Sequence, residues 1–481
     1  MSPKILIIGA GASGIAAATR LYENGYRNLI ILEAENRIGG RIHTVPYADN
    51  VLDYGAQWVH SNVDNVVYDM AAKYNLVEVE AHREDELCIK SNGEEVPVEL
   101  SNRIVDVLEH SVDDVDDLKR YSRSLGDYYS ESFHKALQDG KFADIDSETC
   151  YQIYQSFLNY HNTYNAVDSV FEMSAPGLLE FTDHQDEYLI NWRTRGFKTI
   201  LDLMMKRLPE QKATPIPIEN HVFFNKRVTN ISYPSDPDQP VRVTCSDDSC
   251  YVVDHVIVTV SLGVLKEVYH TLFTPKLPQL HQNAIEGLYI GVIDKMVLEF
   301  EKPFWPNGWH GFAMLWNKND LEELRNSDKS WIEGVASFFV PEHQPNLLVG
   351  WVYGKYARTM EGLPEKEVVD GLLFTLRKFL VKYEIPEAKS FTRSTWYTNR
   401  NFRGSYTSRS MKSDILNAKA AHLAQPLVNS LGLPVVQFAG EASHPEYYST
   451  VQGAVGSGWR EADRIIELYR NKRMTVEFSK L

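Results

Sequence analysis

The first forty residues alternate between short apolar runs and turn-forming residues. A mostly apolar run over 4–8 is followed by a glycine-rich turn and by a helical pattern that lasts to about residue 24. A second apolar run over 29–32 ends at Glu33. Short apolar runs on either side of a helix are typical of parallel strands buried on both faces, so this stretch predicts a β-α-β unit. Its turn contains three glycines, Gly9, Gly11 and Gly14.

Related patterns recur far along the chain. From about residue 100 to 210 the pattern is mostly helical and acidic, and strand patterns return from residue 220. The spacing of apolar positions predicts strands over 293–301, 347–354 and 435–441, and helices over 63–75, 364–383 and 451–469. Because apolar strands of the nucleotide-binding type are scattered over the chain, we expect two interleaved domains rather than two consecutive ones.

The glycine turn predicts a dinucleotide site. Glycines let the backbone approach a pyrophosphate at the N-terminus of the following helix, where N–H groups and the helix dipole favour an anion. Glu33 ends the second strand, where a carboxylate accepts hydrogen bonds from ribose hydroxyls. This pattern alone is compatible with both NAD and FAD.

The residues that follow Glu33 favour FAD. A second glycine pair, Gly39 and Gly40, lies between Arg37 and Arg41, which would supply further backbone donors and two cations for a pyrophosphate. The whole stretch, IILEAENRIGGRIHT, resembles the N-terminal motif of flavin-containing amine oxidases.

The resemblance extends over nearly the whole chain. The segment FAGEASHPEYYSTVQGAVGSGWREADRII over 438–466 is similar to the C-terminal FAD motif of polyamine oxidases. The resemblance implies that Glu441 contacts the flavin ribitol and that a helix N-terminus near Thr450 and Val451 directs backbone donors at the pyrimidine ring. The dipole of that helix would stabilise a reduced, anionic flavin. The segment VFFNKRVTNI resembles the part of the family in which a backbone group, here of Val228, holds the adenine.

Two residues are candidates for the catalytic chemistry. Lys295 opens the run KMVLEF, in which alternation predicts an inward side chain, and the resemblance implies that it binds a water next to flavin N5. Burial would lower the pKa of such a lysine. His60 lies in DYGAQWVHS, where the resemblance places a histidine at the substrate, and its near-neutral pKa suits binding or deprotonating an amine. Trp58 is expected at the cofactor, and Gln57 departs from a histidine often seen at its position.

Aromatic residues are expected to complete the site. An amine reacts as the neutral base, so the site needs apolar or aromatic walls that make an ammonium group costly. The resemblance implies that Trp396, Tyr406, Tyr447 and Tyr448 bring rings to the flavin face. Ser405 occupies the position at which monoamine oxidases attach FAD through a cysteine, and none of the four cysteines lies in that region. We therefore predict non-covalent FAD.

These segments predict an α/β chain with the two-domain flavin amine oxidase fold, in which a Rossmann-like FAD-binding domain is interleaved with an α+β substrate-binding domain. We expect the FAD-binding domain over 1–80, 215–290 and 390–470, and the substrate-binding domain over 81–214 and 291–389, followed by a tail over 471–481. Acids of the substrate-binding domain are expected to bind distal amines, with Asp168, Glu172 and Glu180 as candidates.

Charge and composition narrow the range of partners. The net charge of −16 over 481 residues argues against a nucleic-acid partner and allows cationic ligands. No apolar run approaches the ~18 residues of a membrane helix, so no membrane partner is expected. The cysteines lack metal-ligand spacing, which predicts no metal site. The final Ser479, Lys480 and Leu481 match a peroxisomal address, so we expect a peroxisomal import receptor as partner, and a cytoplasmic protein if the tripeptide is not recognised.

The sequence therefore predicts an FAD-dependent polyamine oxidase. We expect oxidation of spermine, spermidine or their N1-acetyl forms at a secondary amine, with molecular oxygen as acceptor, giving an amine, an aldehyde and hydrogen peroxide. The peroxisomal address favours acetylated substrates by analogy. Four alternatives stay open: a monoamine oxidase, against which Ser405 argues; an L-amino-acid oxidase, which would need an arginine for the carboxylate; a chromatin demethylase, for whose insertions the chain lacks room; and a flavin-binding protein without turnover, against which Lys295 and His60 argue.

Overall fold

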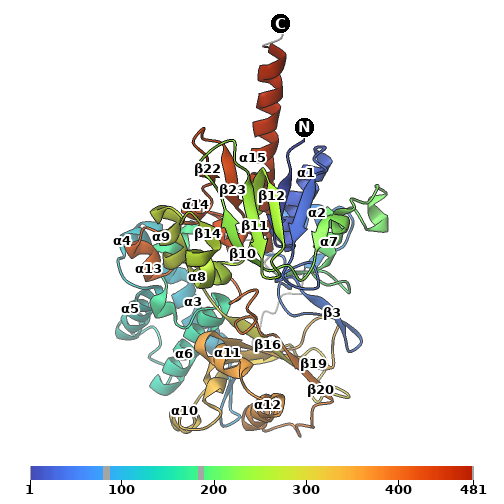
Figure 1. Cartoon of the computed structure of the whole chain (residues 1–481). Helices are drawn as coiled ribbons and strands as arrows, with labels where there is room; N and C mark the ends of the chain where they lie inside the picture. Colours follow the sequence, from blue (N-terminus) through green and yellow to red (C-terminus); the bar gives the residue numbers. More distant parts are fainter. Residues whose placement is uncertain (1, 80–86, 183–188, 479–481) are drawn as a thin grey trace.

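The computed structural model describes residues 2–79, 87–182 and 189–478 (Figure 1). A buried, mainly parallel sheet in it positions the glycine turn. Its strand order is β22-β23-β13-β1-β2-β9. The strands are β1 (Ile5–Ile8), β2 (Leu29–Leu32), β9 (Val222–Phe223), β13 (His255–Val258), β22 (Leu427–Val428) and β23 (Pro434–Phe438). β1 is buried throughout and pairs in parallel with β2 and β13. The predicted β-α-β unit is thus confirmed.

The two faces of β1 enter different cores because successive side chains of a strand point to opposite sides. Ile5 and Ile7 pack with α1 (Ala12–Glu23) and α15 (Val451–Phe478). Leu6 and Ile8 pack against a second sheet of order β12-β11-β10-β14 and against α8 and α9. Those elements are β10 (Val228–Ser232), β11 (Val241–Cys245), β12 (Cys250–Val253), β14 (Phe273–Thr274), α8 (Leu262–Leu272) and α9 (Gln279–Gly287).

A seven-stranded, mostly antiparallel sheet forms the other half of the molecule, below the first sheet in Figure 1. Its order is β20-β16-β19-β18-β17-β6-β7. The strands are β6 (Leu87–Lys90), β7 (Glu95–Val96), β16 (Ile293–Glu299), β17 (Gly311–Leu315), β18 (Val335–Phe339), β19 (Leu347–Tyr353) and β20 (Ser390–Arg393). Helices α10 (Lys318–Arg325), α11 (Gly354–Glu361) and α12 (Glu365–Phe379) pack with this sheet around one apolar core. β16 is buried at all its residues, between β20 and β19.

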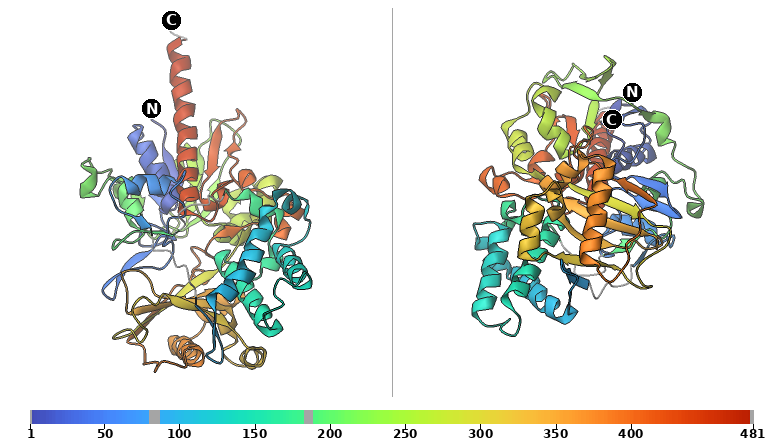
Figure 2. Two further views of the ribbon diagram at one scale, coloured as in Figure 1. Left: turned by 180° about the vertical axis from the view of Figure 1, so that it is seen from behind. Right: turned by 90° about the horizontal axis from the view of Figure 1, so that it is seen from below.

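The acidic segment after residue 97 forms a helical layer beside both sheets (Figure 2). It contains α3 (Val98–Glu109), the 3-10 turn η1 (His110–Asp113), α4 (Val115–Arg120), α5 (Leu125–Gln138) and α6 (Ser147–Tyr164). Side-chain oxygens of Asp114, Ser124 and Asp146 accept backbone N–H groups at the starts of α4, α5 and α6. These N-caps explain why so polar a segment is divided into three helices at those points.

Shorter elements connect the layers. Three two-stranded sheets pair β3 (Thr44–Tyr47) with β4 (Asn50–Asp53), β5 (Glu78–Val79) with β8 (Ile190–Asn191), and β15 (Tyr289–Ile290) with β21 (Thr407–Ser408). The remaining helices are α2 (Val66–Ala72), α7 (Thr199–Met204), α13 (Met411–Ile415) and α14 (Ala420–Leu423). In the described part of the chain, no helix is both long enough and apolar enough to cross a membrane.

The strands of the parallel sheet all come from the three segments expected to form the FAD-binding domain, which explains their scatter along the sequence. β20 lies in the third of these segments and yet pairs with β16 of the other sheet. α15 continues past the expected end at residue 469 to Phe478, and its last part projects beyond the body of the molecule (Figure 1).

Candidate active site

One large cavity, of about 1240 Å³, runs from the glycine turn to the helical layer. Its walls come from both sheets and from α3 to α6, so residues far apart in sequence meet in it. Of the residues expected at the site, sixteen line this cavity: Gly9, Gly11, Glu33, Gly39, Gly40, Arg41, Trp58, His60, Val228, Lys295, Trp396, Tyr406, Glu441, Tyr448, Thr450 and Val451.

The glycine end of the cavity is a backbone cradle. α1 begins at Gly11 without a side-chain cap and without an acidic residue in its first turn, so its N-terminus suits an anion. The second glycine loop lies directly beside the first, because Gly39 donates its N–H to the Ala10 carbonyl at 2.8 Å. A Cβ on Gly14 would overlap the carbonyl oxygen of Gly9. Gly14 thus packs the helix against the turn behind the cradle, whose exposed backbone fits a pyrophosphate.

Charged side chains at this end have different partners. Glu33, at the end of β2, accepts N–H groups from Ala10 at 2.7 Å and Glu35 at 2.8 Å, and burial raises its pKa. Arg37 was expected to face a pyrophosphate, but it donates to the carbonyls of the second glycine loop, including that of Gly40 at 2.8 Å. Arg37 is therefore a residue that shapes the cradle, whereas Arg41 lines the cavity itself.

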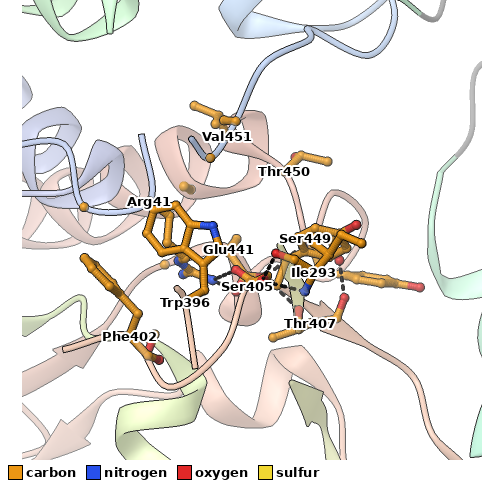
Figure 3. Close-up of a pocket in the computed structure, with 18 of the residues that line it drawn as sticks. Arg41, Ile293, Trp396, Phe402, Ser405, Thr407, Glu441, Ser449, Thr450 and Val451 are labelled. Carbon is orange, nitrogen blue, oxygen red and sulfur yellow. Dashed lines mark hydrogen bonds and ion pairs between the residues drawn. The ribbon is translucent and has the colours of Figure 1, made fainter. Parts of the chain in front are cut away.

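Glu441 is the centre of a buried network in the middle of the cavity (Figure 3). One carboxylate oxygen accepts Arg41 Nη1 at 2.9 Å, and the other accepts Thr407 Oγ1 at 2.7 Å and the Ser449 N–H at 2.9 Å. These bonds place the start of α15, with Thr450 before it, on the cavity wall. The first turn of α15 has no acidic residue, so its N–H groups favour an electron-rich ligand.

Lys295 lies on β16, lines the same cavity and is 4% exposed. Its Nζ donates to the carbonyls of Asp53 at 2.7 Å and Gly55 at 3.0 Å, and to Gln57 Oε1 at 2.6 Å. It also lies 5.2 Å from the centre of the Trp351 ring. Burial lowers the pKa of Lys295 to about 7, and the charge of Asp53 opposes that shift. A lysine held in this way exchanges its proton at neutral pH.

The loop after β20 brings Trp396 and Ser405 to the same wall. Trp396 is 6% exposed and packs edge-on against Phe402. Ser405 accepts the Ile293 N–H at 2.9 Å and donates to the Ile293 carbonyl at 2.9 Å, so its hydroxyl joins this loop to the start of β16. Figure 3 shows Ser405 and Trp396 beside Glu441 and Arg41. The sequence indicated Ser405 only as the absence of a cysteine, whereas the fold gives it a structural role.

Two of the three expected tyrosines reach the cavity. Tyr406 donates to the Tyr164 carbonyl of the helical layer at 2.9 Å, and burial raises its pKa. Tyr448 is 7% exposed, and burial raises its pKa to about 12. Tyr447 is not among the lining residues, and its ring packs against His444. The two tyrosines lie in the turn that precedes α15, and this turn directs only Tyr448 to the cavity.

Several lining residues were not expected from the sequence. Trp351 contacts Lys295 and also stacks on Trp58 with ring centres 5.8 Å apart, whereas Gln57, noted in the sequence only as a departure from histidine, is a hydrogen-bond partner of Lys295. At the far end Glu109 and Asp113 line the cavity. The three acids expected there are not among the cavity-lining residues: Asp168 pairs with Arg358, Glu180 pairs with Arg409, and Glu172 is exposed. A distal acid is recognisable only once the helices are placed, because nothing local distinguishes one acid of this segment from another.

A nucleotide-binding parallel sheet whose glycine cradle shares one cavity with a buried lysine from a second sheet defines a two-domain, dinucleotide-dependent oxidoreductase. The family model described as "Flavin containing amine oxidoreductase" matches residues 12–466. The chain therefore belongs to the flavin-containing amine oxidoreductase family and is an FAD-dependent amine oxidase.

Similar proteins occur in animals and in plants. A peroxisomal N(1)-acetyl-spermine/spermidine oxidase from Bos taurus is 28% identical, with 97% of this chain and 95% of the relative covered. Its Homo sapiens counterpart is 29% identical with the same coverage, and a probable polyamine oxidase from Arabidopsis thaliana is 27% identical, covering 97% and 98%. Among solved structures, putrescine oxidase bound to putrescine has a TM-score of 0.70 at 19% identity, covering 97% of this chain and 99% of that one. This likeness confirms the predicted fold.

Proposed function

We propose that this protein is a polyamine oxidase that acts on a secondary amine of spermine, spermidine or their N1-acetyl forms and yields an amine, an aldehyde and hydrogen peroxide. The observation that carries the proposal is the distribution of charge along the cavity. Around Lys295 the walls are aromatic, with Trp58, Trp351 and Tyr406, whereas Glu109 and Asp113 line the far end. A polyamine matches this distribution because one amine reacts as the neutral base while another remains an ammonium group.

The residues that would hold FAD lie along the backbone cradle and the Glu441 network. We assign the pyrophosphate to the two glycine loops with Arg41, the ribose to Glu33, the adenine to Val228, and the flavin to Trp58, Trp396, Glu441, Thr450 and Val451. Bound FAD supplies the two-electron oxidation of the carbon–nitrogen bond and passes the electrons to molecular oxygen. Since Ser405 bonds to Ile293 through its hydroxyl, we propose that FAD is bound non-covalently, so acid denaturation releases it into solution, and flavin retained by the precipitate would contradict this.

The chain's own residues prepare the amine. The aromatic walls disfavour an ammonium group near Lys295, which promotes loss of the amine proton before reaction. Lys295 Nζ is held by three oxygens and, with a pKa of about 7, holds or releases a proton at neutral pH. His60 lines the same cavity and is assigned to binding or deprotonating the amine.

The deciding experiment follows the flavin absorbance without oxygen during mixing with spermine, N1-acetylspermine, benzylamine or leucine. The proposal expects rapid bleaching by one or both polyamines and slow bleaching by the other two. Preference for benzylamine or leucine would replace the substrate class while leaving the FAD-dependent amine oxidase intact. The ratio of the two polyamine rates decides between free and acetylated substrates.

A paired variant tests the far end. In Glu109→Gln/Asp113→Asn both side chains keep their size and lose their charge, so KM for spermine is expected to rise about tenfold or more, because an ion pair of moderate strength is lost. The maximal rate of flavin reduction and the weak rate with benzylamine are expected to stay the same. Equal effects on spermine and benzylamine would show that these acids do not bind the distal amine.

An amino-acid substrate requires a cation for its carboxylate. Arg409 lines the cavity, but its Nε donates to Glu180 at 2.6 Å and its guanidinium lies 4.0 Å from the centre of the Tyr448 ring. Glu180 thus engages only Nε, whereas Nη1 and Nη2 are buried and have no hydrogen-bond partner among the described residues, so Arg409 is the residue that a carboxylate substrate would use. The leucine sample above tests this point directly.

We also propose a peroxisomal location. The two animal relatives named above are described as peroxisomal, and this chain ends in Ser-Lys-Leu. The tripeptide lies outside the described residues, which end at residue 478 with α15. Removal of the three residues is expected to leave a fluorescently tagged protein in the cytoplasm, and an unchanged peroxisomal signal would refute the address.

A further inference from the structure

Next to Lys295 on β16 lies a second ionisable group, Asp294, that the mechanism above does not use. It is fully buried, and alternation along the strand directs it to the face opposite Lys295. Its Oδ1 accepts Ser394 Oγ at 2.7 Å and the Trp396 N–H at 3.2 Å. Its Oδ2 is buried and receives no hydrogen bond from a donor in the described residues. A carboxylate oxygen left in that state would be costly, whereas a protonated oxygen that donates to an acceptor would not.

The neighbouring acceptor is a second carboxyl group. Glu361, at the end of α11, is 7% exposed and lies beside Asp294, because both carboxyl groups accept N–H groups of consecutive residues in one loop. Each oxygen of Glu361 already accepts one backbone N–H, from Tyr397 at 2.8 Å and from Thr398 at 2.6 Å. Glu361 is therefore arranged as a pure acceptor, as a carboxylate is. Burial and the neighbouring Glu361 raise the pKa of Asp294 well above its usual value, in agreement with the hydrogen-bond pattern.

We propose that Asp294 and Glu361 share a proton, carried by Asp294 Oδ2, and that this acid pair positions the loop of Trp396 against the strand of Lys295. The three hydrogen bonds to backbone N–H groups all go to consecutive residues 396–398 of one loop, and the pair joins that loop to β16 and to α11 at once. Asp294 and Glu361 are thus positioning residues. The proposal rests on the functions proposed for Lys295 and Trp396.

The charged residues around Asp294 and Glu361 balance one negative charge on the pair and not two. Arg393, on β20, is attracted by both carboxyl groups, and its terminal nitrogens donate to the carbonyls of Met360 and Leu363 at 2.6 Å each. Glu365 also attracts Arg393, and Arg403, which Glu361 attracts as well, is paired with Glu267. Loss of the shared proton would place two carboxylates together in a buried site, which would push the loop away from β16.

Substitution of each carboxyl group by an amide of the same shape distinguishes a shared proton from ordinary packing. In Asp294→Asn the amide oxygen replaces Oδ1 and the amide N–H₂ replaces the protonated Oδ2, so every hydrogen bond is kept. In Glu361→Gln an N–H₂ group must face the N–H of Tyr397 or Thr398, so one bond becomes a clash of donors. The variant Asp294→Leu removes the pair's bonds while keeping a similar volume.

The experiment compares the three holoenzymes by their flavin content, the visible circular dichroism of the bound flavin, and the rate of flavin reduction by the best amine. Asp294→Asn is expected to match the wild type within about twofold, while Glu361→Gln and Asp294→Leu lose roughly tenfold or more in rate and change the flavin dichroism, because misplacement near 1 Å costs that much or more. Impairment of Asp294→Asn with Glu361→Gln unharmed would overturn the assignment of the proton. Wild-type behaviour of all three would overturn the positioning role.

The proton on Asp294 can also be measured directly, which tests the proposal even if Glu361→Gln or Asp294→Leu does not fold. Infrared spectra of protein labelled with ¹³C-aspartate are expected to contain the carbonyl band of a protonated carboxyl group at neutral pH, and Asp294→Asn is expected to lose it. Absence of such a band in the wild type would overturn the proposal. If no polyamine reduces the wild-type flavin, the proposed substrate fails, whereas the dichroism and the infrared band still decide on the acid pair.

Discussion

The two ends of the cavity are built by different means. At the end formed by the parallel sheet, two short glycine loops present their backbone to the cavity, and these loops lie with Glu33 and Arg41 within about forty positions of the sequence. At the end formed by the seven-stranded sheet and the helical layer, the cavity is lined by single side chains from many elements, such as Lys295, Trp351 and Glu109. A phosphate-bearing cofactor needs a fixed backbone, whereas an amine substrate needs particular side chains held at a distance from one another.

The comparison predicts that damage at the backbone end abolishes cofactor binding altogether. In Gly14→Ala the added Cβ meets the Gly9 carbonyl, and helix and turn have to move apart. We expect a folded protein that purifies largely without flavin, measured as the ratio of flavin to protein absorbance. Gly140→Asn is the matched control, because Gly140 has a left-handed φ of 72° that asparagine tolerates and open space around it. Full flavin content in Gly14→Ala would contradict the prediction, because it would show that the helix and the turn can move apart without loss of FAD binding.

Damage at the side-chain end is expected to spare the cofactor and slow the chemistry. Lys295→Met is expected to lower the rate of flavin reduction or of reoxidation about 100-fold, as removal of a proton-transfer group does, while FAD stays bound. The control is Lys266→Met: burial also lowers the pKa of Lys266, to about 8, yet this lysine is not among the cavity-lining residues. Equal loss in both variants, or no loss in either, would remove Lys295 from the mechanism.

A charge placed beside Lys295 is expected to move its titration. The wild-type rate should change as Lys295 loses its proton around pH 7. Gln57→Glu puts a carboxylate where Gln57 Oε1 accepts Lys295 Nζ at 2.6 Å, which should raise the lysine pKa by about 1–3 units and shift the inflection of the pH–rate profile upward by the same amount. An inflection that stays near pH 7 would belong to another group.

The same lysine predicts a dependence of stability on pH. Its pKa is about 7 in the folded protein against 10.5 for an ordinary lysine, so between these values the unfolded chain binds the additional proton. Stability from this group therefore rises as the pH increases from 7 towards 10, and it is lowest below pH 7. The melting temperature of the wild type minus that of Lys295→Met should grow over this range, and a constant difference would contradict a buried, neutralised lysine.

The smallest expected effect is at the joint between the two ends. Ser405→Ala removes the two hydrogen bonds to Ile293, and the buried N–H and carbonyl lose one partner. We expect a loss of about 1–3 kcal/mol in the free energy of unfolding, with flavin content and reduction rate nearly unchanged. Urea denaturation of the holoenzyme measures it, and a large loss of activity would assign Ser405 a function beyond joining the loop to β16.

The cofactor end was predictable from sequence because its determinants are local. Strand, glycines, helix and Glu33 follow one another, and only one arrangement satisfies the backbone approach to a pyrophosphate. Arg37 shows the limit even here, since the pattern indicated a cation for the cofactor and the fold directs it to loop carbonyls. Tyr447 and Tyr448 show another limit, since adjacent aromatic residues look equivalent in a motif until the backbone assigns one of them to the cavity.

By itself, the sequence determined the β-α-β start, the order of the interleaved segments, the glycine cradle and the chemical types available for amine oxidation. Tertiary structure alone decided that Lys295 meets Gln57 and Asp53, that Glu109 and Asp113 rather than Asp168, Glu172 or Glu180 end the cavity, and that Asp294 faces Glu361. The physical reason is that backbone geometry repeats over neighbouring residues, whereas burial, pKa and the pairing of charges depend on groups that approach through space from distant parts of the chain.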